Sequence, residues 1–258
     1  MDSRLQDTFD VARRSRDVLA LRPVAPVAPV ALAALVLDLD HVLYDASPWQ
    51  RWLLQLLNRI GLHTHYQAFF CAFERDYLES VYRGEREYWD ALKAYLLEAG
   101  VSRGRIEEVL AAGHGKHREL WQNVRPLPGV AATLSQLAAR GVRLAVLSNA
   151  VSSTAGLQAR LEHLGIAARF EVVISSRDLG VAKPAPESYQ AAINALDLSP
   201  DLIGFIGHET LELAGAGIAG LTTFAINHSP DAQADVYLDR FEQLSQLVAP
   251  PAIKQRVG

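Results

Sequence analysis

Strand-like and helical patterns alternate along the second half of the chain, and this alternation most limits the folds open to it. Apolar runs of strand length lie at 142–147, 170–174, 202–206 and 222–226. Helical patterns lie between and beside them, at 130–140, 154–164, 186–196 and about 210–219. Repeated units of this kind indicate a parallel sheet with helices on both faces, so we expect an α/β fold.

An earlier strand belongs to the same set. The apolar run Leu35–Leu37 ends in two carboxylates, Asp38 and Asp40, separated by one residue. Side chains two apart on an extended chain point the same way, and ligands of open α/β sheets bind at the carboxyl ends of strands. Two carboxylates in one place repel unless a cation, a shared proton or a metal-bound group joins them. A solvated pair that only caps the next turn is the plain structural alternative.

Between this strand and residue 125 the apolar period is helical throughout. We expect five helices, at 47–60, 66–82, 85–99, 102–110 and 116–124. The chain therefore divides into an α/β core of residues 31–45 and 125–249 and an inserted helical domain of residues 46–124. The insertion is expected to cover the functional edge of the sheet.

The two ends of the chain read as additions to this core. Residues 1–22 have the pattern of an amphipathic helix, and prolines at every third position over 23–30 favour a stiff spacer. An arginine pair before this stretch faintly resembles an export signal, but prolines interrupt it and its far end is the strand carrying Asp38. We therefore expect an appendage over 1–30 and a loose tail over 250–258.

Composition excludes several classes of protein. The net charge of −4 offers no basic field for nucleic acid, and no apolar run reaches the length of a membrane span. The single cysteine, Cys71, excludes an intrachain disulfide and fits a reducing cytoplasm; we expect it to pack among its aromatic neighbours. Whether the N-terminal helix makes a homodimer stays open.

Three more strand ends carry groups capable of chemistry. Ser148 and Asn149 follow one strand, Lys183 follows the next, and His208 follows a third with Glu209 and Glu212 close behind. Each has an ordinary explanation as a helix cap, a solvated side chain or a turn residue. Their order and their common position at strand ends favour a shared site.

These residues form four ordered motifs: Asp38-Leu39-Asp40; Leu147-Ser148-Asn149; Lys183-Pro184 with Tyr189; and Gly207-His208-Glu209 with Glu212. With them, the chain from about 34 to 245 resembles the haloacid dehalogenase-like (HAD) hydrolase superfamily. The subgroup is the one with a helical cap inserted after the first strand. The resemblance implies a Rossmann-like parallel sheet with a helical cap domain.

The resemblance implies a phosphatase that acts on a small phosphorylated metabolite. Asp38 matches the nucleophile that forms an aspartyl phosphate, and Asp40 matches the acid and base that serves the leaving alcohol. Ser148 and the backbone N–H groups around Asn149 would hold phosphoryl oxygens, and Lys183 would offset their charge. The cap is expected to choose the substrate, whose identity stays open among nucleotides, sugar phosphates and phosphoglycolate.

The resemblance also implies Mg²⁺, held by the Asp38 carboxylate and the Asp40 backbone carbonyl. The next metal ligand in such phosphatases is an Asp at the position of His208, and imidazole is a poor ligand for Mg²⁺. Three outcomes stay open: Glu212 or Glu209 supplies the carboxylate, Mn²⁺ or Zn²⁺ uses His208, or no metal binds.

Two other functions remain as alternatives. The 2-haloacid dehalogenases of this superfamily work without metal and lack an acid at the position of Asp40, because a halide leaves without a proton. The presence of Asp40 therefore favours phosphate esters. The last alternative is a non-catalytic member that binds a phosphorylated ligand or a partner protein.

Overall fold

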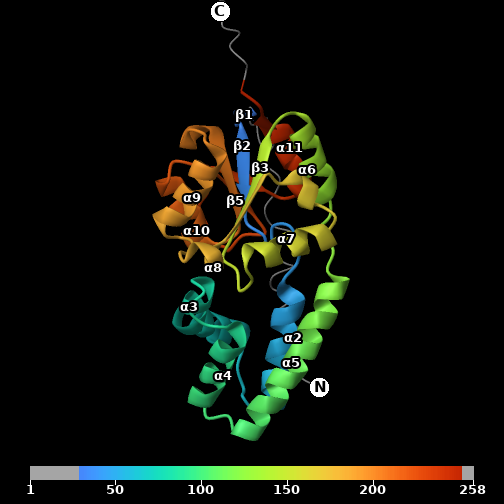
Figure 1. Ribbon diagram of the computed structural model, residues 1–258, viewed down its shortest axis with the longest axis vertical. Coiled ribbons are helices and arrows are strands. Elements are labelled where there is room, and N and C mark those ends of the chain that lie inside the picture. Colours follow the sequence, from blue (N-terminus) through green and yellow to red (C-terminus); the bar gives the residue numbers. More distant parts are fainter. Residues whose placement is uncertain (1–28, 252–258) are drawn as a thin grey trace, which may run out of the picture.

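The computed structural model describes residues 29–251 and has at its centre a six-stranded parallel sheet (Figure 1). The strands are β2 (Ala34–Leu37), β3 (Arg143–Ser148), β4 (Val172–Ser175), β5 (Ile203–Gly207), β6 (Thr222–Ile226) and β7 (Val236–Leu238). Their order is β4-β3-β2-β5-β6-β7, and every neighbouring pair is parallel. The α/β fold expected from the alternating pattern is confirmed.

Helices cover both faces of the sheet. One face carries α6 (Val130–Ala139), α7 (Thr154–His163) and α11 (Leu244–Leu247); the other carries α9 (Pro186–Leu196) and α10 (Thr210–Ile218). Short helical turns complete the core: η3 (Ala167–Arg169), α8 (Ser176–Leu179), η4 (Pro200–Leu202) and η5 (Phe241–Gln243). Leu35 and Leu37 pack on the first face and Val36 on the second, which explains why the β2 sequence is apolar without interruption.

The strand order reverses between β2 and β5. From β2 the chain builds outward through β3 to β4, whereas from β5 it builds the other way through β6 to β7. The crossovers therefore diverge at the carboxyl ends of β2 and β5 and leave a crevice there. Ligands of open α/β sheets bind at such a switch point, and Asp38 and His208 are the residues that directly follow these two strands.

The segment between β2 and α6 is helical and lies beyond the carboxyl ends of the strands (Figure 1). Its helices are α2 (Ser47–Arg59), η1 (Gln67–Cys71), η2 (Glu74–Leu78), α3 (Glu79–Tyr82), α4 (Tyr88–Glu98) and α5 (Arg103–Asn123). They bury a separate apolar cluster that includes Leu53, Leu57, Phe69, Phe73 and Leu92. We call this segment the cap.

The structure corrects three details of the expected cap. The helices expected at 102–110 and 116–124 are one helix, α5, because Gly113 lies inside it against the Trp89 ring and does not end it. The helix expected at 66–82 contains two π-helical stretches, η1 and η2. Cys71, expected to be packed, is exposed at the end of η1.

A second, two-stranded sheet was not expected. Strand β1 (Val30–Ala31) pairs in parallel with β8 (Val248–Ala249), so Val30, expected to belong to the appendage, is part of a strand. The expected N-terminal helix, residues 23–28 of the spacer and the tail from 252 lie outside the described residues. Within 29–251, no helix combines the length and apolar character needed to cross a bilayer.

Candidate active site

Asp38 lies at the centre of the crevice. Its backbone N–H donates to the Ile206 carbonyl at 2.9 Å, which extends the β2–β5 pairing by one residue and fixes the carboxylate at the switch point. The residue is 4% exposed. Burial alone would raise the pKa of Asp38, but the positive charges of Lys183 and His208 outweigh it and hold this pKa far below its usual range. Asp38 is therefore ionised.

Lys183 joins two carboxylates. Its Nζ lies 2.8 Å from Asp38 Oδ1 and 2.9 Å from Glu212 Oε2, and its side chain is fully buried. Burial lowers the pKa of Lys183, yet the two carboxylates raise it overall. A lysine at this depth is tolerated because both neighbouring charges have the opposite sign.

Asn149 holds the lysine loop in place. Its side-chain Nδ2 donates to the Lys183 carbonyl at 2.9 Å and its Oδ1 accepts from the Lys183 N–H at 2.8 Å. Nδ2 also lies 3.2 Å from Glu212 Oε1. The side chain of Asn149 thus supports Lys183 and Glu212, a role that its place at a strand end did not indicate.

Glu212 comes from the first turn of α10 and is 7% exposed. Its backbone carbonyl accepts a hydrogen bond from the Tyr189 hydroxyl at 2.7 Å, which ties α10 to α9. Burial raises the pKa of Glu212 to about 7 even though Lys183 acts in the opposite direction. The acidic residue that reaches the Asp38 site is therefore Glu212, four residues after His208.

His208 faces Asp38 from the end of β5. Its Nδ1 lies 3.3 Å from Asp38 Oδ2, but not in hydrogen-bond geometry. Among the described residues, Nδ1 of His208 is a buried side-chain atom that has no hydrogen-bond partner. Its Nε2 lies 3.5 Å from Glu209 Oε1. Burial lowers the pKa of His208, but Asp38 and Glu209 raise it to about 10, so without a bound ion the ring is cationic.

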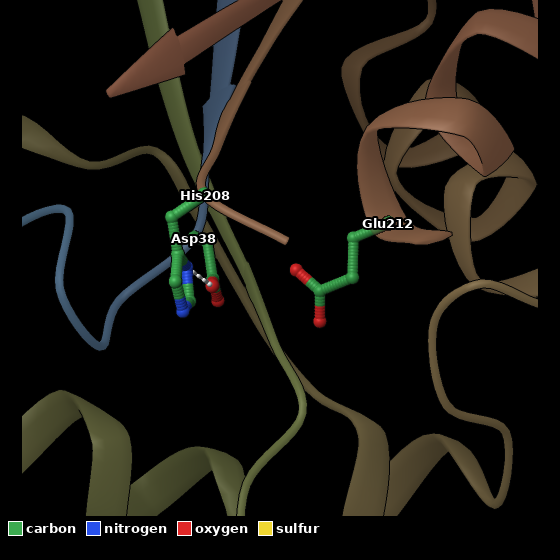
Figure 2. Close-up of side chains that lie close together, drawn as sticks. All are labelled: Asp38, His208 and Glu212. Atoms are coloured by element: carbon green, nitrogen blue, oxygen red, sulfur yellow. Dashed lines mark ion pairs between the residues drawn. The ribbon is translucent and has the colours of Figure 1, made fainter. Parts of the chain in front are cut away.

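Asp38, His208 and Glu212 form a group that could hold a metal ion, with one donor atom from each lying within 4.8 Å of the others. Figure 2 shows Asp38 and His208 side by side and Glu212 directed toward them from α10. The 3.3 Å between Nδ1 and Oδ2 suits neighbouring ligands at about 2.1 Å from one ion. One imidazole with two carboxylates fits Mn²⁺ or Zn²⁺ better than Mg²⁺, which prefers oxygen.

Asp40 and Ser148 lie on the wall of the same cavity. Asp40 is half-buried, and its Oδ1 accepts a hydrogen bond from the Tyr44 hydroxyl. Ser148, the last residue of β3, is 3% exposed. His41, beside Asp40, adopts the left-handed backbone conformation (φ 60°) that this position of the turn requires.

The cavity has a volume of about 700 Å³ and lies between the strand ends and the cap. Aromatic cap residues that line it include Trp49, Tyr66, Tyr82 and Trp121. Two cavity residues, Tyr44 and Arg160, were not singled out as site residues from the sequence. Tyr44 comes four residues after Asp40 and could have been suspected from the sequence. Arg160 lies within the helix expected at 154–164, and no motif around it indicates a place in the site.

Comparison with known proteins shows which proteins this chain resembles. Residues 32–220 match the family model of the haloacid dehalogenase-like hydrolases. Ribulose-1,5-bisphosphate 5-phosphatase of Halopiger xanaduensis is 26% identical over 220 residues, which are 80% of this chain and 90% of that protein. (S)-2-haloacid dehalogenase 1 of a Pseudomonas species is 27% identical over 139 residues, 54% of this chain and 60% of the dehalogenase.

Solved structures show the same fold. A dehalogenase crystal structure superposes with a TM-score of 0.62 at 23% identity and covers 84% of this chain and 97% of its own. A predicted phosphoglycolate phosphatase from Haemophilus somnus gives a TM-score of 0.62 at 20% identity and covers 83% of this chain and 96% of its own. Both kinds of hydrolase therefore share this sheet-and-cap arrangement.

Proposed function

The chain belongs to the haloacid dehalogenase-like hydrolases, and from this premise we propose that it is a phosphatase acting on a small phosphorylated metabolite through an aspartyl phosphate. The observation that carries the proposal is the second carboxylate, Asp40, on the wall of the cavity that also contains Asp38. An alcohol leaving group needs a proton, which a carboxyl group in this position can supply. A halide leaving group needs none.

In the proposed reaction, an oxygen of the ionised Asp38 carboxylate attacks phosphorus and the bond from phosphorus to the ester oxygen breaks. That bond's electrons go to the alcohol oxygen, which takes a proton from Asp40. Water then attacks the aspartyl phosphate, Asp40 accepts the proton of the water, and phosphate leaves with Asp38 restored. Proton transfer by a well-placed group is generally worth about 10²–10⁴ in rate.

Charge balance supports a role for Lys183 in both steps. The phosphoryl group adds about two negative charges beside Asp38 and Glu212, and in a buried site these repel strongly. Lys183 Nζ, within 2.9 Å of both carboxylates, offsets part of this charge. We propose that Ser148 and the backbone N–H groups around Asn149 hold the phosphoryl oxygens at the end of β3.

A divalent ion would complete the charge balance. The family's phosphatases imply Mg²⁺; from the donor set we propose that Mn²⁺ or a similar ion fits Asp38, His208 and Glu212 better. When bound, it would supply positive charge beside the phosphoryl group. The single cysteine also supports a cytoplasmic location as part of this proposal.

Dehalogenation of a 2-haloacid is the second candidate. Lys183 and His208 already place two cationic groups on Asp38, an arrangement that can serve a carboxylate nucleophile with no metal. The dehalogenase relatives favour the same candidate. Asp40 has no evident task in that reaction, which is why we place it second.

Activity of the purified protein separates the candidates. The substrates are 4-nitrophenyl phosphate and 2-chloropropionate, and each is tested in the presence of a chelator, of Mg²⁺ and of Mn²⁺. The Asp38→Asn variant is assayed under the same conditions. The matched control is Asp197→Asn, because Asp197 ends α9, before β5 begins, in a left-handed conformation that Asn also adopts. We expect phosphate release that Mn²⁺ stimulates and that only Asp38→Asn abolishes. Halide release in chelator, without phosphate release, would establish the dehalogenase instead.

A further inference from the structure

The Tyr44 hydroxyl lies between Asp40, the proposed acid, and the half-buried guanidinium of Arg160. It donates a hydrogen bond to Asp40 Oδ1, and it accepts a hydrogen bond from Arg160 Nη1 at 3.1 Å. Tyr44 is 3% exposed. Burial and the charge of Asp40 raise the pKa of Tyr44 well above its ordinary value, so the phenol stays protonated and remains a donor.

The backbone fixes Tyr44 against Asp40. The His41 N–H donates to the Tyr44 carbonyl at 2.8 Å, and Asp40 and Tyr44 form an isolated parallel bridge. Tyr44 also forms an antiparallel bridge with Pro126, at the point where the chain returns from the cap. The main chain of Tyr44 is therefore held close to Asp40 by this turn.

Arg160 has no carboxylate partner in the part of the chain that the structure describes; its polar side-chain contact there is the Tyr44 hydroxyl. The guanidinium lies over the Trp121 ring of α5, with Cζ 3.4 Å from the ring centroid. Trp121 also packs edge-on against Tyr44 at 5.5 Å. Arg160 is thus held between the cap and the tyrosine that contacts Asp40.

These contacts set the direction of one proton. A guanidinium has five donors and no acceptor, so the Tyr44 hydroxyl proton cannot point to Arg160 and must point to Asp40. Oδ1 of Asp40 is then always an acceptor, and the exchangeable proton of Asp40 belongs on Oδ2. A carboxyl group held in this way presents one fixed oxygen to the leaving alcohol.

We infer that Tyr44, oriented by Arg160, is the positioning residue for the acid–base carboxyl of Asp40; this rests on the proposed phosphatase function. Asp40 Oδ2 gives its proton to the ester oxygen as the bond to phosphorus breaks and later takes one from water. Trp121 of α5 contacts both Arg160 and Tyr44, so a movement of the cap would shift the residues that position Asp40.

The test is Tyr44→Phe, which removes the hydroxyl and keeps the ring that packs on Trp121. We compare kcat/KM for phenyl phosphate, whose leaving group needs a proton, with kcat/KM for 4-nitrophenyl phosphate, whose leaving group scarcely does. We expect a loss of about a hundredfold for phenyl phosphate and under about threefold for 4-nitrophenyl phosphate. Asp40→Asn should show the same selectivity, and Tyr44→Phe should add little to it.

Tyr77→Phe is the matched control, because the Tyr77 hydroxyl also donates to a carboxylate, that of Glu98, but on the outer side of the cap. It should leave both rates unchanged. Arg160→Gln should reproduce the selectivity of Tyr44→Phe in weaker form. Equal losses on both esters, or full additivity with Asp40→Asn, would overturn the inference while the phosphatase function stood. A wild-type protein that cleaves neither ester would overturn both.

Discussion

Asp38 shares its two carboxylate oxygens between two cationic side chains, Lys183 at 2.8 Å and His208 at 3.3 Å. Lys183 is shared in turn with Glu212, so the buried charges alternate in sign. This arrangement keeps a buried nucleophile ionised. It also makes residue 208 the position at which the metal preference of the site is decided.

His208→Asp should change that preference. An oxygen donor in place of imidazole suits Mg²⁺, so we expect kcat/KM measured in Mg²⁺ to rise at least about tenfold and the advantage of Mn²⁺ to disappear. The measurement is phosphate release by the chelated protein after addition of each ion. His228→Asp, which adds a carboxylate at an exposed part of the cavity wall, serves as control. Rates in chelator as high as those after addition of either ion, in the wild-type protein and in His208→Asp, would contradict a metal role.

At the residue scale the sequence predicts individual groups better than the contacts between them. Asp38, Lys183 and Glu212 could be assigned to one site because parallel strands place their ends at one edge. The contact of Tyr44 with Arg160 joins residues 116 apart, and no local pattern indicates it. The support that Asn149 gives to Lys183 was likewise missed, because a strand-end asparagine reads equally well as a helix cap.

Among the elements, α5 contains three glycines, Gly104, Gly113 and Gly115. A Cβ added at Gly113 would lie 2.8 Å from Trp89 Cζ3, whereas one added at Gly115 would meet nothing within 4 Å. Gly113 therefore permits the close approach of α5 to α4, and Gly115 has no such task.

These two glycines give a matched pair of substitutions. Gly113→Ala should destabilise the protein by about 1–3 kcal/mol because the Trp89 ring must move. Gly115→Ala should stabilise it by about 0.5–1 kcal/mol, since alanine loses less backbone entropy in a helix. Urea unfolding of both variants measures the difference. A stabilising Gly113→Ala would show that α5 and α4 do not pack as described.

The same helix shows why the sequence misplaced some boundaries. Glycine in a sequence usually indicates the end of a helix. Gly113 instead lies inside α5, where it makes room for the Trp89 ring, a contact that the sequence alone does not reveal. Strands β1 and β8 have two residues each, too short for a period to be read. The long elements of the core, by contrast, have clear apolar periods, and their expected positions were right to within a few residues.

In the molecule as a whole, the packing of the cap depends on pH through one half-buried histidine, His117. His117 of α5 packs edge-on against Trp49 and Trp89, and its Nε2 accepts a hydrogen bond from Trp121 Nε1 at 2.9 Å. This bond requires an unprotonated Nε2. Burial, with the nearby charge of Arg160, lowers the pKa of His117 from 6.5 to about 4.

Stability should therefore depend on pH through His117. The unfolded chain takes up a proton below 6.5 and the folded chain only near 4, so this contribution is present above 6.5 and is lost as the pH falls toward 4. Allowing for partial exposure, we expect a loss of about 1–2 kcal/mol in the free energy of unfolding. His117→Gln keeps an acceptor for Trp121 and should flatten the stability profile between about pH 7.5 and about pH 5. The control is His163→Gln, at an exposed position of α7, which should leave the profile unchanged. An unchanged profile in His117→Gln would contradict this assignment.

At the scale of the whole molecule, the switch point of the sheet brings Asp38 and His208 together and the cap closes the cavity over them. The central claim is that Asp38 is the nucleophile that takes the phosphoryl group from the substrate. Its most direct test is acid quenching of Asp40→Asn during turnover of 4-nitrophenyl phosphate, followed by peptide mass spectrometry. Removal of the base should slow water attack, so we predict a phosphoryl group on Asp38 and none in the Asp38→Asn, Asp40→Asn double variant. Turnover with no phosphorylated Asp38 peptide, or with the phosphoryl group on another residue, would contradict the account.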